Sequence, residues 1–171
     1  MSEPETTHLV RTTINDEPYE RVVQARQLLV HFIRDTLALK GTHIGCDTGN
    51  CGACTVLYDG QPIKSCMMLA VQADGASIET VESLSQPGGE LDELQRAFND
   101  QHAVQCGWCT PGMLMQAKAL LERDGDPDVE TIRRTLKGNL CRCTGYVNIV
   151  RAIQDAAGQP VTAGTRPEDR A

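Results

Sequence analysis

The spacing of apolar and polar residues predicts that the chain begins with β-strands. Residues 8–14 and 19–25 are rich in strand-forming residues, and the polar residues 15–18 separate them, so they predict a β-hairpin. Residues 55–64 predict a second hairpin, because two strand-like runs flank an Asp-Gly turn. Residues 77–81 are expected to form the last strand of the same sheet.

One helix is predicted to pack against this sheet. Leu29, Ile33 and Leu37 recur at every fourth position within residues 28–39, as they would on one face of a helix. Gly41 follows this pattern and is a typical helix end. The first half of the chain therefore predicts an open β-sheet with one packed helix, an α+β arrangement.

The pattern becomes helical from about residue 82 onward. After a turn-rich linker at residues 85–89, four helices are predicted, over residues 90–100, 111–123, from Asp126 or Asp128 to about Gly138, and 146–157. Four apolar stripes bury one another by packing together as a bundle. The sequence thus predicts a sheet domain over residues 8–82, a four-helix domain over residues 88–157 and a flexible tail over residues 158–171.

Eight cysteines divide into two sets of four, one in each predicted domain. The first quartet has the spacing C-x4-C-x2-C followed by a fourth cysteine, which is that of plant-type [2Fe–2S] ferredoxins; it consists of Cys46, Cys51, Cys54 and Cys66. Gly45, Gly49 and Gly52 allow the backbone to wrap closely and to aim N–H groups at sulfur. Structural zinc sites usually combine two short Cys pairs, which this quartet lacks, so an iron–sulfur cluster is favoured.

The second quartet consists of two short pairs, Cys106 with Cys109 and Cys141 with Cys143. Two short pairs are also typical of structural zinc sites, so zinc stays an alternative here. Thr110 and Thr144 each follow a cysteine and are expected to cap a helix, whose positive end would favour a negatively charged cluster. The histidines are not needed as ligands and are expected on the surface or in packing; they are His8, His31, His43 and His102.

Composition and charge exclude several other functions. The net charge is −7, with dispersed Lys and Arg and few aromatic residues, which argues against a nucleic-acid partner. No apolar run is long enough for a transmembrane helix, and residues 1–7 do not resemble a signal peptide. We therefore expect a cytoplasmic protein with reduced, metal-bound cysteines, located either free or at the inner face of the membrane through its partners.

Three runs of residues resemble one known family. The runs Cys46 to Val56, Gln105 to Met113 and Gly138 to Tyr146 resemble the two-cluster subunit of the molybdenum hydroxylases, the xanthine oxidase and aldehyde oxidoreductase family. The resemblance covers residues 8–157. Residues 43–48 look most like the small subunit of aerobic carbon monoxide dehydrogenase, with the small subunits of N-heterocycle and aldehyde hydroxylases as alternatives.

This resemblance implies a fold, cofactors and partners. It implies a ferredoxin-like (β-grasp) domain followed by a four-helix domain, each with one [2Fe–2S] cluster. Molybdopterin would be bound by a large subunit and FAD by a medium subunit, in a dimer of heterotrimers. Electrons would pass from molybdopterin to the helical-domain cluster, then to the ferredoxin-type cluster and to FAD. Gln105 and Cys143 would lie against the molybdopterin, and no substrate chemistry would occur on this chain.

Two function classes outside this family remain as alternatives. A free-standing ferredoxin would carry electrons between soluble partners, but it would need only the first domain. A zinc-stabilised interaction module would use the cysteines structurally. Of these classes, the electron-transfer subunit accounts for both quartets.

Overall fold

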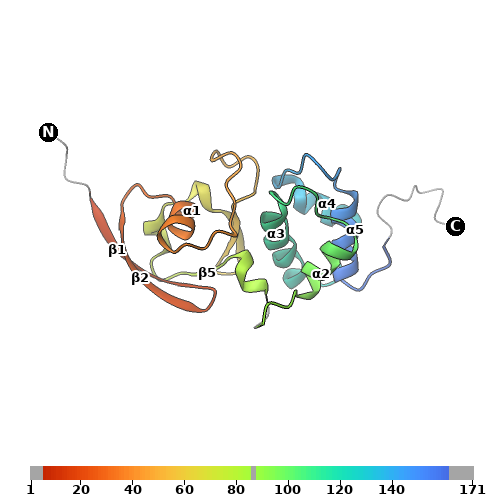
Figure 1. Ribbon diagram of the computed structural model, residues 1–171, viewed down its shortest axis with the longest axis horizontal. Coiled ribbons are helices and arrows are strands. Elements are labelled where there is room, and N and C mark those ends of the chain that lie inside the picture. Colours follow the sequence, from red (N-terminus) through yellow and green to blue (C-terminus); the bar gives the residue numbers. More distant parts are fainter. Residues whose placement is uncertain (1–5, 86–87, 162–171) are drawn as a thin grey trace.

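A computed structural model describes residues 6–85 and 88–161 of the chain, which form a sheet half and a helical half side by side (Figure 1). The sheet half contains, within these residues, five strands: β1 (Thr7–Ile14), β2 (Glu17–Gln24), β3 (Thr55–Tyr58), β4 (Gln61–Lys64) and β5 (Ser77–Glu79). Their order is β2-β1-β5-β3-β4, and β1 and β5 are parallel while the other pairs are antiparallel. The expected mixture of helices and a sheet, an α+β fold, is confirmed.

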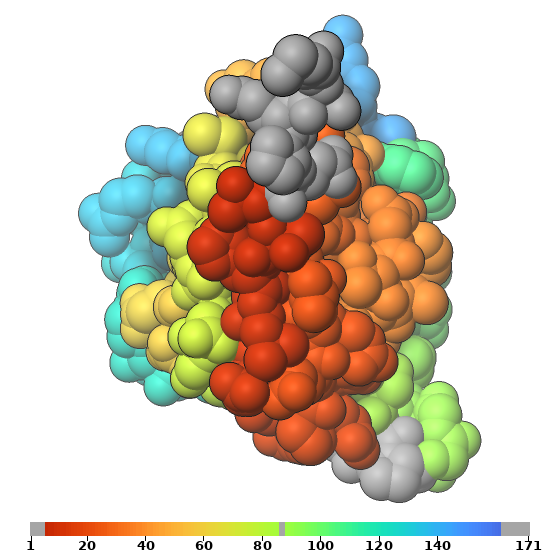
Figure 2. Space-filling view, turned by 90° about the vertical axis from the view of Figure 1, so that its left-hand side faces the viewer, coloured from red at the N-terminus to blue at the C-terminus, as the bar shows by residue number. Residues whose placement is uncertain are grey.

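Both predicted hairpins are present. Asn15 and Asp16 connect β1 to β2 with positive φ angles of 53° and 65°, and Asp59 and Gly60 connect β3 to β4 with φ angles of 47° and 76°. Two consecutive residues with positive φ form the tight turn that matches the twist of a β-hairpin. Pro18, expected in the first turn, instead lies in β2 opposite Thr13, where an edge strand tolerates its missing N–H group. Figure 2 shows this hairpin (red) along the face turned away from the helical half.

The helix predicted over residues 28–39 is shorter than expected. Helix α1 (Leu29–His31) continues only as a π-helical turn from Phe32 to Thr36. Ala38, with a φ of 61°, then reverses the chain before Gly41 is reached. Gly41 serves a packing role instead: its N–H donates to Glu82 Oε1 at 2.7 Å, and a Cβ there would lie 2.5 Å from Val81 Cγ1. The apolar spacing identified the buried face correctly but not the length of the helix.

The core of the sheet half lies between the sheet and the α1 segment. It is a cluster of buried apolar side chains to which β1, α1, β3 and β5 each contribute. Its fully buried members include Ile14, Leu29, Phe32, Ile33, Val56 and Ile78. The loop that contains the first cysteines connects the α1 segment to β3, and both of these elements are anchored in this core.

The helical half contains four helices within the described residues: α2 (Glu93–Asp100), α3 (Thr110–Arg123), α4 (Val129–Thr135) and α5 (Val147–Ala156). Asp92 caps α2 by accepting the N–H of Gln95, and Asp128 caps α4 by accepting the N–H of Thr131 at 2.6 Å. A short 3-10 turn, Leu136–Gly138, follows α4. These helices occupy the four predicted regions, and Asp128, not Asp126, is the cap of the third one.

One apolar cluster unites the four helices with the sheet half. It contains Phe98, Met113, Leu120, Ile132 and Ile153, which are at most 2% exposed, and it extends to Leu57 of β3. Helix α3 lies on the side of the helical half that faces the sheet (Figure 1). The predicted domain limits at residues 82 and 88 stay predictions. Linker residues 86–87 and tail residues 162–171 lie outside the described residues.

The described helices do not resemble membrane spans. Across residues 6–85 and 88–161, none has the length and apolar character that crossing a bilayer requires.

The two halves contact each other so closely at Gly112 that an added methyl group there should destabilise the fold. A Cβ on Gly112 of α3 would lie 2.2 Å from Gly52 O, a distance at which backbone must move. Gly112→Ala should therefore lower the free energy of unfolding by about 1–3 kcal/mol in urea titrations of the full chain. Gly125→Ala is the matched control, because a Cβ there meets nothing within 4 Å. Equal stability of the two variants would contradict this packing.

Candidate iron–sulfur centres

The first quartet lies at one end of the sheet, on the loop between α1 and β3 and on the turn after β4. Cys46 and Cys51 are half-buried in the loop, while Cys54 immediately before β3 and Cys66 after β4 are buried. Val30 of α1 packs against Cys54 and Cys66 in a small apolar cluster. The fold thus brings the fourth cysteine, which is distant in sequence, to the same loop as the other three.

Backbone donors in this loop point at sulfur. The N–H of Cys51 donates to Cys46 Sγ at 3.2 Å and the N–H of Thr48 donates to it at 3.5 Å. The side chain and backbone of Thr48, with the backbone of Cys51, lower the pKa of the Cys46 thiol to about 6. A thiolate is the form that ligates metal, so Cys46 is preorganised as a ligand.

At the buried Cys66 the thiol pKa is shifted in the opposite direction from that of Cys46. Burial, together with the nearby sulfur atoms of Cys54 and Cys46, raises the pKa of Cys66 to about 11. Adjacent thiolates repel one another in a dry environment unless a cation is bound between them. A bound cation would therefore favour the thiolate form of Cys66 beside Cys54.

The shape of the loop also fits a cluster. A Cβ on Gly45 would lie 2.9 Å from Cys51 Sγ, and a Cβ on Gly49, whose φ is +75°, would lie 2.9 Å from Met67 Sδ. Lys64 Nζ donates to Gly49 O at 2.6 Å and adds a positive charge beside the loop. A negatively charged cluster is stabilised by such donors and cations, so the residues present fit a [2Fe–2S] group.

The second quartet lies where two loops of the helical half meet. Cys106 and Cys109 precede α3, and Cys141 and Cys143 lie between the 3-10 turn and α5. Burial, with the nearby sulfur atoms of Cys141 and Cys106, raises the pKa of Cys109 to about 12. The adjacent Cys106 raises the pKa of Cys143. Cys106 and Cys143 are exposed, whereas Cys109 and Cys141 are half-buried.

Thr144 bonds both to sulfur and to the residue that precedes α5. Its hydroxyl donates to Cys141 Sγ at 3.1 Å and its N–H approaches the same atom at 3.5 Å. Burial opposes these bonds, but the bonds prevail and lower the pKa of Cys141. The predicted capping role of Thr110 is wrong, because α3 already begins at Thr110 after a helical Cys109. Thr144 is not the residue before α5, but its Oγ1 accepts the N–H of Tyr146, which is that residue, at 3.1 Å.

The eight cysteines form no disulfide bond with one another. Within residues 6–85 and 88–161, no three His, Cys, Asp or Glu side chains converge as ligands of a single metal ion. The thiols that influence each other's pKa through side-chain hydrogen bonds are Cys46 with Cys51, Cys54 with Cys66, Cys109 with Cys141, and Cys106 with Cys143. Two pairs in each quartet match a cluster in which each of two irons is held by two thiolates.

Three polar or aromatic residues lie beside the second quartet. Gln105, predicted to contact molybdopterin, is exposed next to Cys106. Trp108 is 54% exposed and stacks on His43 with ring centroids 4.6 Å apart. Trp108 Nε1 donates to Ile44 O at 3.2 Å, and His43 Nδ1 lies 3.0 Å from Trp108 O. His43 is therefore a packing residue, as expected, and it connects the two cysteine loops.

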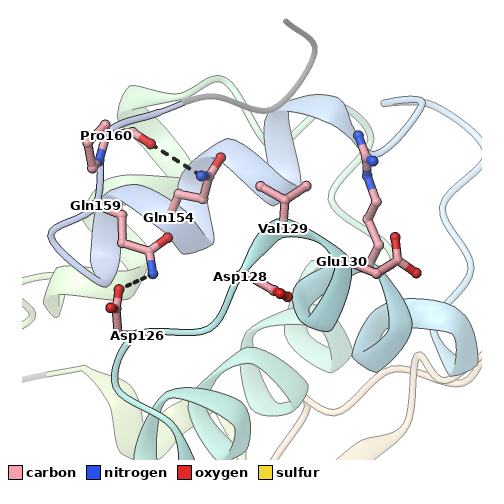
Figure 3. A pocket seen from close by; sticks show the side chains of 8 residues that line it. Asp126, Asp128, Val129, Glu130, Gln154, Gln159 and Pro160 are labelled. Carbon is pink, nitrogen blue, oxygen red and sulfur yellow. Dashed lines mark hydrogen bonds between the residues drawn. The ribbon is translucent and has the colours of Figure 1, made fainter. Parts of the chain in front are cut away.

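An open hollow beside α4 and α5 is lined by polar and charged side chains and by Val129 and Pro160 (Figure 3). It has a volume of about 560 Å³ and is lined by residues of α4, α5 and the chain around them, including Asp126, Asp128 and Arg133. Gln159 donates to Asp126, and Gln154 Nε2 donates to Pro160 O at 3.2 Å. Internal hydrogen bonds thus already use polar groups of this hollow, which contains no cysteine.

The sequence interpretation missed one residue between the quartets. Asn139 is 2% exposed, and its side-chain amide bonds to backbone of both halves. Its position two residues before Cys141 was visible in the sequence, but an asparagine beside a glycine is most simply interpreted as a turn residue. Only the three-dimensional contacts identify it as buried.

Comparisons with known proteins agree with this geometry. The family described as "2Fe-2S iron-sulfur cluster binding domain" matches residues 12–83, and the family described as "[2Fe-2S] binding domain" matches residues 80–154. One family therefore covers each cysteine quartet.

Similar proteins and structures share nearly the whole chain. Caffeine dehydrogenase subunit gamma of Pseudomonas sp. (strain CBB1) is 48% identical over 166 residues, 95% of this chain and 98% of the relative. Nicotine 6-hydroxylase small subunit of Paenarthrobacter nicotinovorans is 52% identical over 137 residues, 80% of this chain and 82% of the relative. A chain of quinoline 2-oxidoreductase from Pseudomonas putida 86 superposes with a TM-score of 0.86 at 48% identity, covering 88% of this chain and 93% of that chain.

The paired geometry predicts that the two quartets respond independently to loss of a thiol. Cys143→Ser should remove the signal of the second cluster and lower the iron content from about four to about two atoms per chain. The signal of the first cluster should persist, because its pairs use other residues. Electron paramagnetic resonance of the reduced protein with iron analysis measures both effects. Simultaneous loss of both signals would refute independent sites.

The hydroxyl of Thr144 should tune the second cluster. Thr144→Val removes the O–H donor to Cys141 Sγ and should lower the reduction potential of that cluster on the order of tens of millivolts. The cause is a weaker stabilisation of the more negative, reduced form. Thr144→Ser keeps the hydroxyl and should retain the original potential in a redox titration. A potential that is the same in all three proteins would show that this hydrogen bond has no such effect.

Proposed function

We propose that this chain, which belongs to the family of small [2Fe–2S] electron-transfer subunits of the molybdenum hydroxylases, serves a hydroxylase of N-heterocyclic substrates. In this proposal a large subunit binds molybdopterin and a medium subunit binds FAD. Each cluster, when bound, accepts and releases one electron. The first quartet would hold one cluster and the second quartet the other, with the residues described above as ligands.

The observation that carries the electron-relay role is the unequal exposure of the two quartets. Cys106 and Cys143 reach the surface, whereas the first quartet contains the buried Cys54 and Cys66. An exposed ligand pair gives a partner's cofactor close access to the second site. The second quartet is therefore the entry point that we propose for electrons from the large subunit.

The surface beside this exposed pair is suited to a protein partner. Its loops and the first residue of α5 carry several large apolar side chains that are 38–55% exposed, namely Val104, Trp108, Leu140 and Val147. Large apolar groups gathered on a surface mark interaction sites. We assign this surface to the large subunit, with exposed Gln105 hydrogen-bonding the molybdopterin and Cys143 beside it.

The assignment of an N-heterocyclic substrate comes from the relatives. Caffeine, nicotine and quinoline, which name three of them, all contain nitrogen in an aromatic ring. Carbon monoxide, suggested by residues 43–48, is the second candidate and an aldehyde the third. The substrate pocket belongs to the large subunit, so this chain does not select the substrate.

The native complex tests the substrate class directly. The chain should be purified with its partners and assayed with an N-heterocycle panel, purines, aldehydes and carbon monoxide, with an artificial dye as electron acceptor. We expect turnover of at least one N-heterocycle and release of a hydroxylated product. Turnover of carbon monoxide or an aldehyde alone would refute the substrate class but leave the relay role intact.

We also propose an assembly and a location for the complex. We propose one large and one medium subunit per chain, paired as a dimer of heterotrimers, in the cytoplasm or at the inner face of the membrane. The mass of the native complex tests this assembly. A chain that purifies alone and exchanges electrons with a soluble reductase would instead support the free-standing ferredoxin.

A further inference from the structure

The backbones of the two cysteine loops are joined by one hydrogen bond. The N–H of Leu140 donates to the carbonyl oxygen of Cys51 at 2.8 Å. Cys51 belongs to the first quartet, and Leu140 immediately precedes Cys141 of the second quartet. A single hydrogen bond therefore links a proposed ligand of one cluster to the neighbour of a proposed ligand of the other.

The side chain of Asn139 holds this junction together. Its Nδ2 donates to Gly52 O at 3.0 Å, to Gly112 O at 3.0 Å and to Thr55 Oγ1 at 3.2 Å. These acceptors come from the first cysteine loop, the first turn of α3 and the start of β3. One amide thus connects both halves of the molecule at the point where the loops meet.

The neighbouring acceptors fix the orientation of the Asn139 side-chain amide. Two of its partners are carbonyl oxygens, which accept only, so the NH2 group must face them. The hydroxyl of Thr55 donates to Gly52 O at 2.7 Å, which leaves an oxygen lone pair free to accept from Asn139. The residue is 2% exposed, and loss of its amide would remove its buried hydrogen bonds to Gly52 O and Gly112 O, which join the two halves.

The backbone of Asn139 is held from the other side as well. Tyr146 Oη donates to Asn139 O at 3.1 Å and accepts the N–H of Cys141 at 2.8 Å. The segment from Asn139 to Cys141 is therefore fixed by its side chain on one side and by Tyr146 on the other. The Leu140 N–H has little freedom to leave the Cys51 carbonyl.

We propose that Asn139 is a positioning residue for electron transfer between the two clusters. By fixing the Cys51 and Cys141 loops against each other, its amide sets the separation across which the electron passes. In this step the reduced cluster of the second quartet loses one electron and is oxidised, and the cluster of the first quartet gains it; no bond or proton is transferred. The inference rests on the proposed electron-relay function.

A residue that only stabilises the fold would not change the coupling of two intact clusters, and this difference makes the inference testable. The magnetic interaction between two reduced clusters falls steeply with their separation and splits their electron paramagnetic resonance signals. We expect the reduced Asn139→Ala complex to keep both signals at full intensity, to lose the splitting and to equilibrate electrons between clusters more slowly after rapid reduction. Asn148→Ala is the control, since its side chain bonds to His102 O within the helical half. Unchanged splitting and rate in Asn139→Ala would overturn the inference.

A second pair of variants decides the matter if Asn139→Ala does not assemble its clusters. Leu140→Pro deletes the N–H that bonds to Cys51, and the extended Asn139 backbone, with φ −121° and ψ 111°, suits a residue before proline. Leu140→Ala keeps the N–H and changes only a side chain that is 55% exposed. Loss of splitting in Leu140→Pro but not in Leu140→Ala supports the inference, and splitting in both overturns it.

Measurements on the unmodified complex distinguish a failure of the proposed function from a failure of this inference. Absence of two [2Fe–2S] signals there would overturn the proposed function and this inference together. Two signals with a splitting that no Asn139 or Leu140 variant changes would overturn the inference alone.

Discussion

The structure depends on holding eight sulfur atoms in two loop systems at a fixed distance from each other. None of the eight cysteines lies in a strand, although β3 begins directly after Cys54 and α3 directly after Cys109. Loops cannot maintain such positions alone, because their backbone is not restrained by a regular hydrogen-bond ladder. The two apolar cores therefore act as supports, and the close contact of Gly112 with the Gly52 carbonyl sets how near the loops can come.

Electrostatics explain why these loops have their particular neighbours. A four-thiolate cluster is negatively charged and needs donors and cations without bulky side chains in between. Thr48, Thr144 and the Cys51 backbone supply donors to sulfur, and Lys64 supplies a charge beside the first loop. The two quartets differ in exposure, since Cys106 and Cys143 are exposed and Cys54 and Cys66 are buried, and on this difference we base the proposed direction of electron transfer.

Much of this arrangement could be predicted from the sequence, and the failures have physical reasons. Hairpin turns such as Asp59-Gly60 and helix caps act locally, so the sequence predicted this turn correctly and narrowed the cap of α4 to Asp126 or Asp128, of which Asp128 is the cap. The segment after Leu29 has a helical apolar spacing but ends early, because the chain must turn toward the cysteine loop. Asn139 was missed because its partners, Gly52 and Gly112, are far from it in sequence and are backbone atoms. The ligand roles of the cysteines were predicted from spacing and remain to be measured.

The central claim is that this one chain holds two distinct [2Fe–2S] clusters. Iron and acid-labile sulfide analysis of the purified native complex, combined with electron paramagnetic resonance after reduction, tests it most directly. Two distinct [2Fe–2S] signals are expected, with about four irons and four sulfides in this chain. A complex whose cysteine quartets contain zinc and no iron would contradict it.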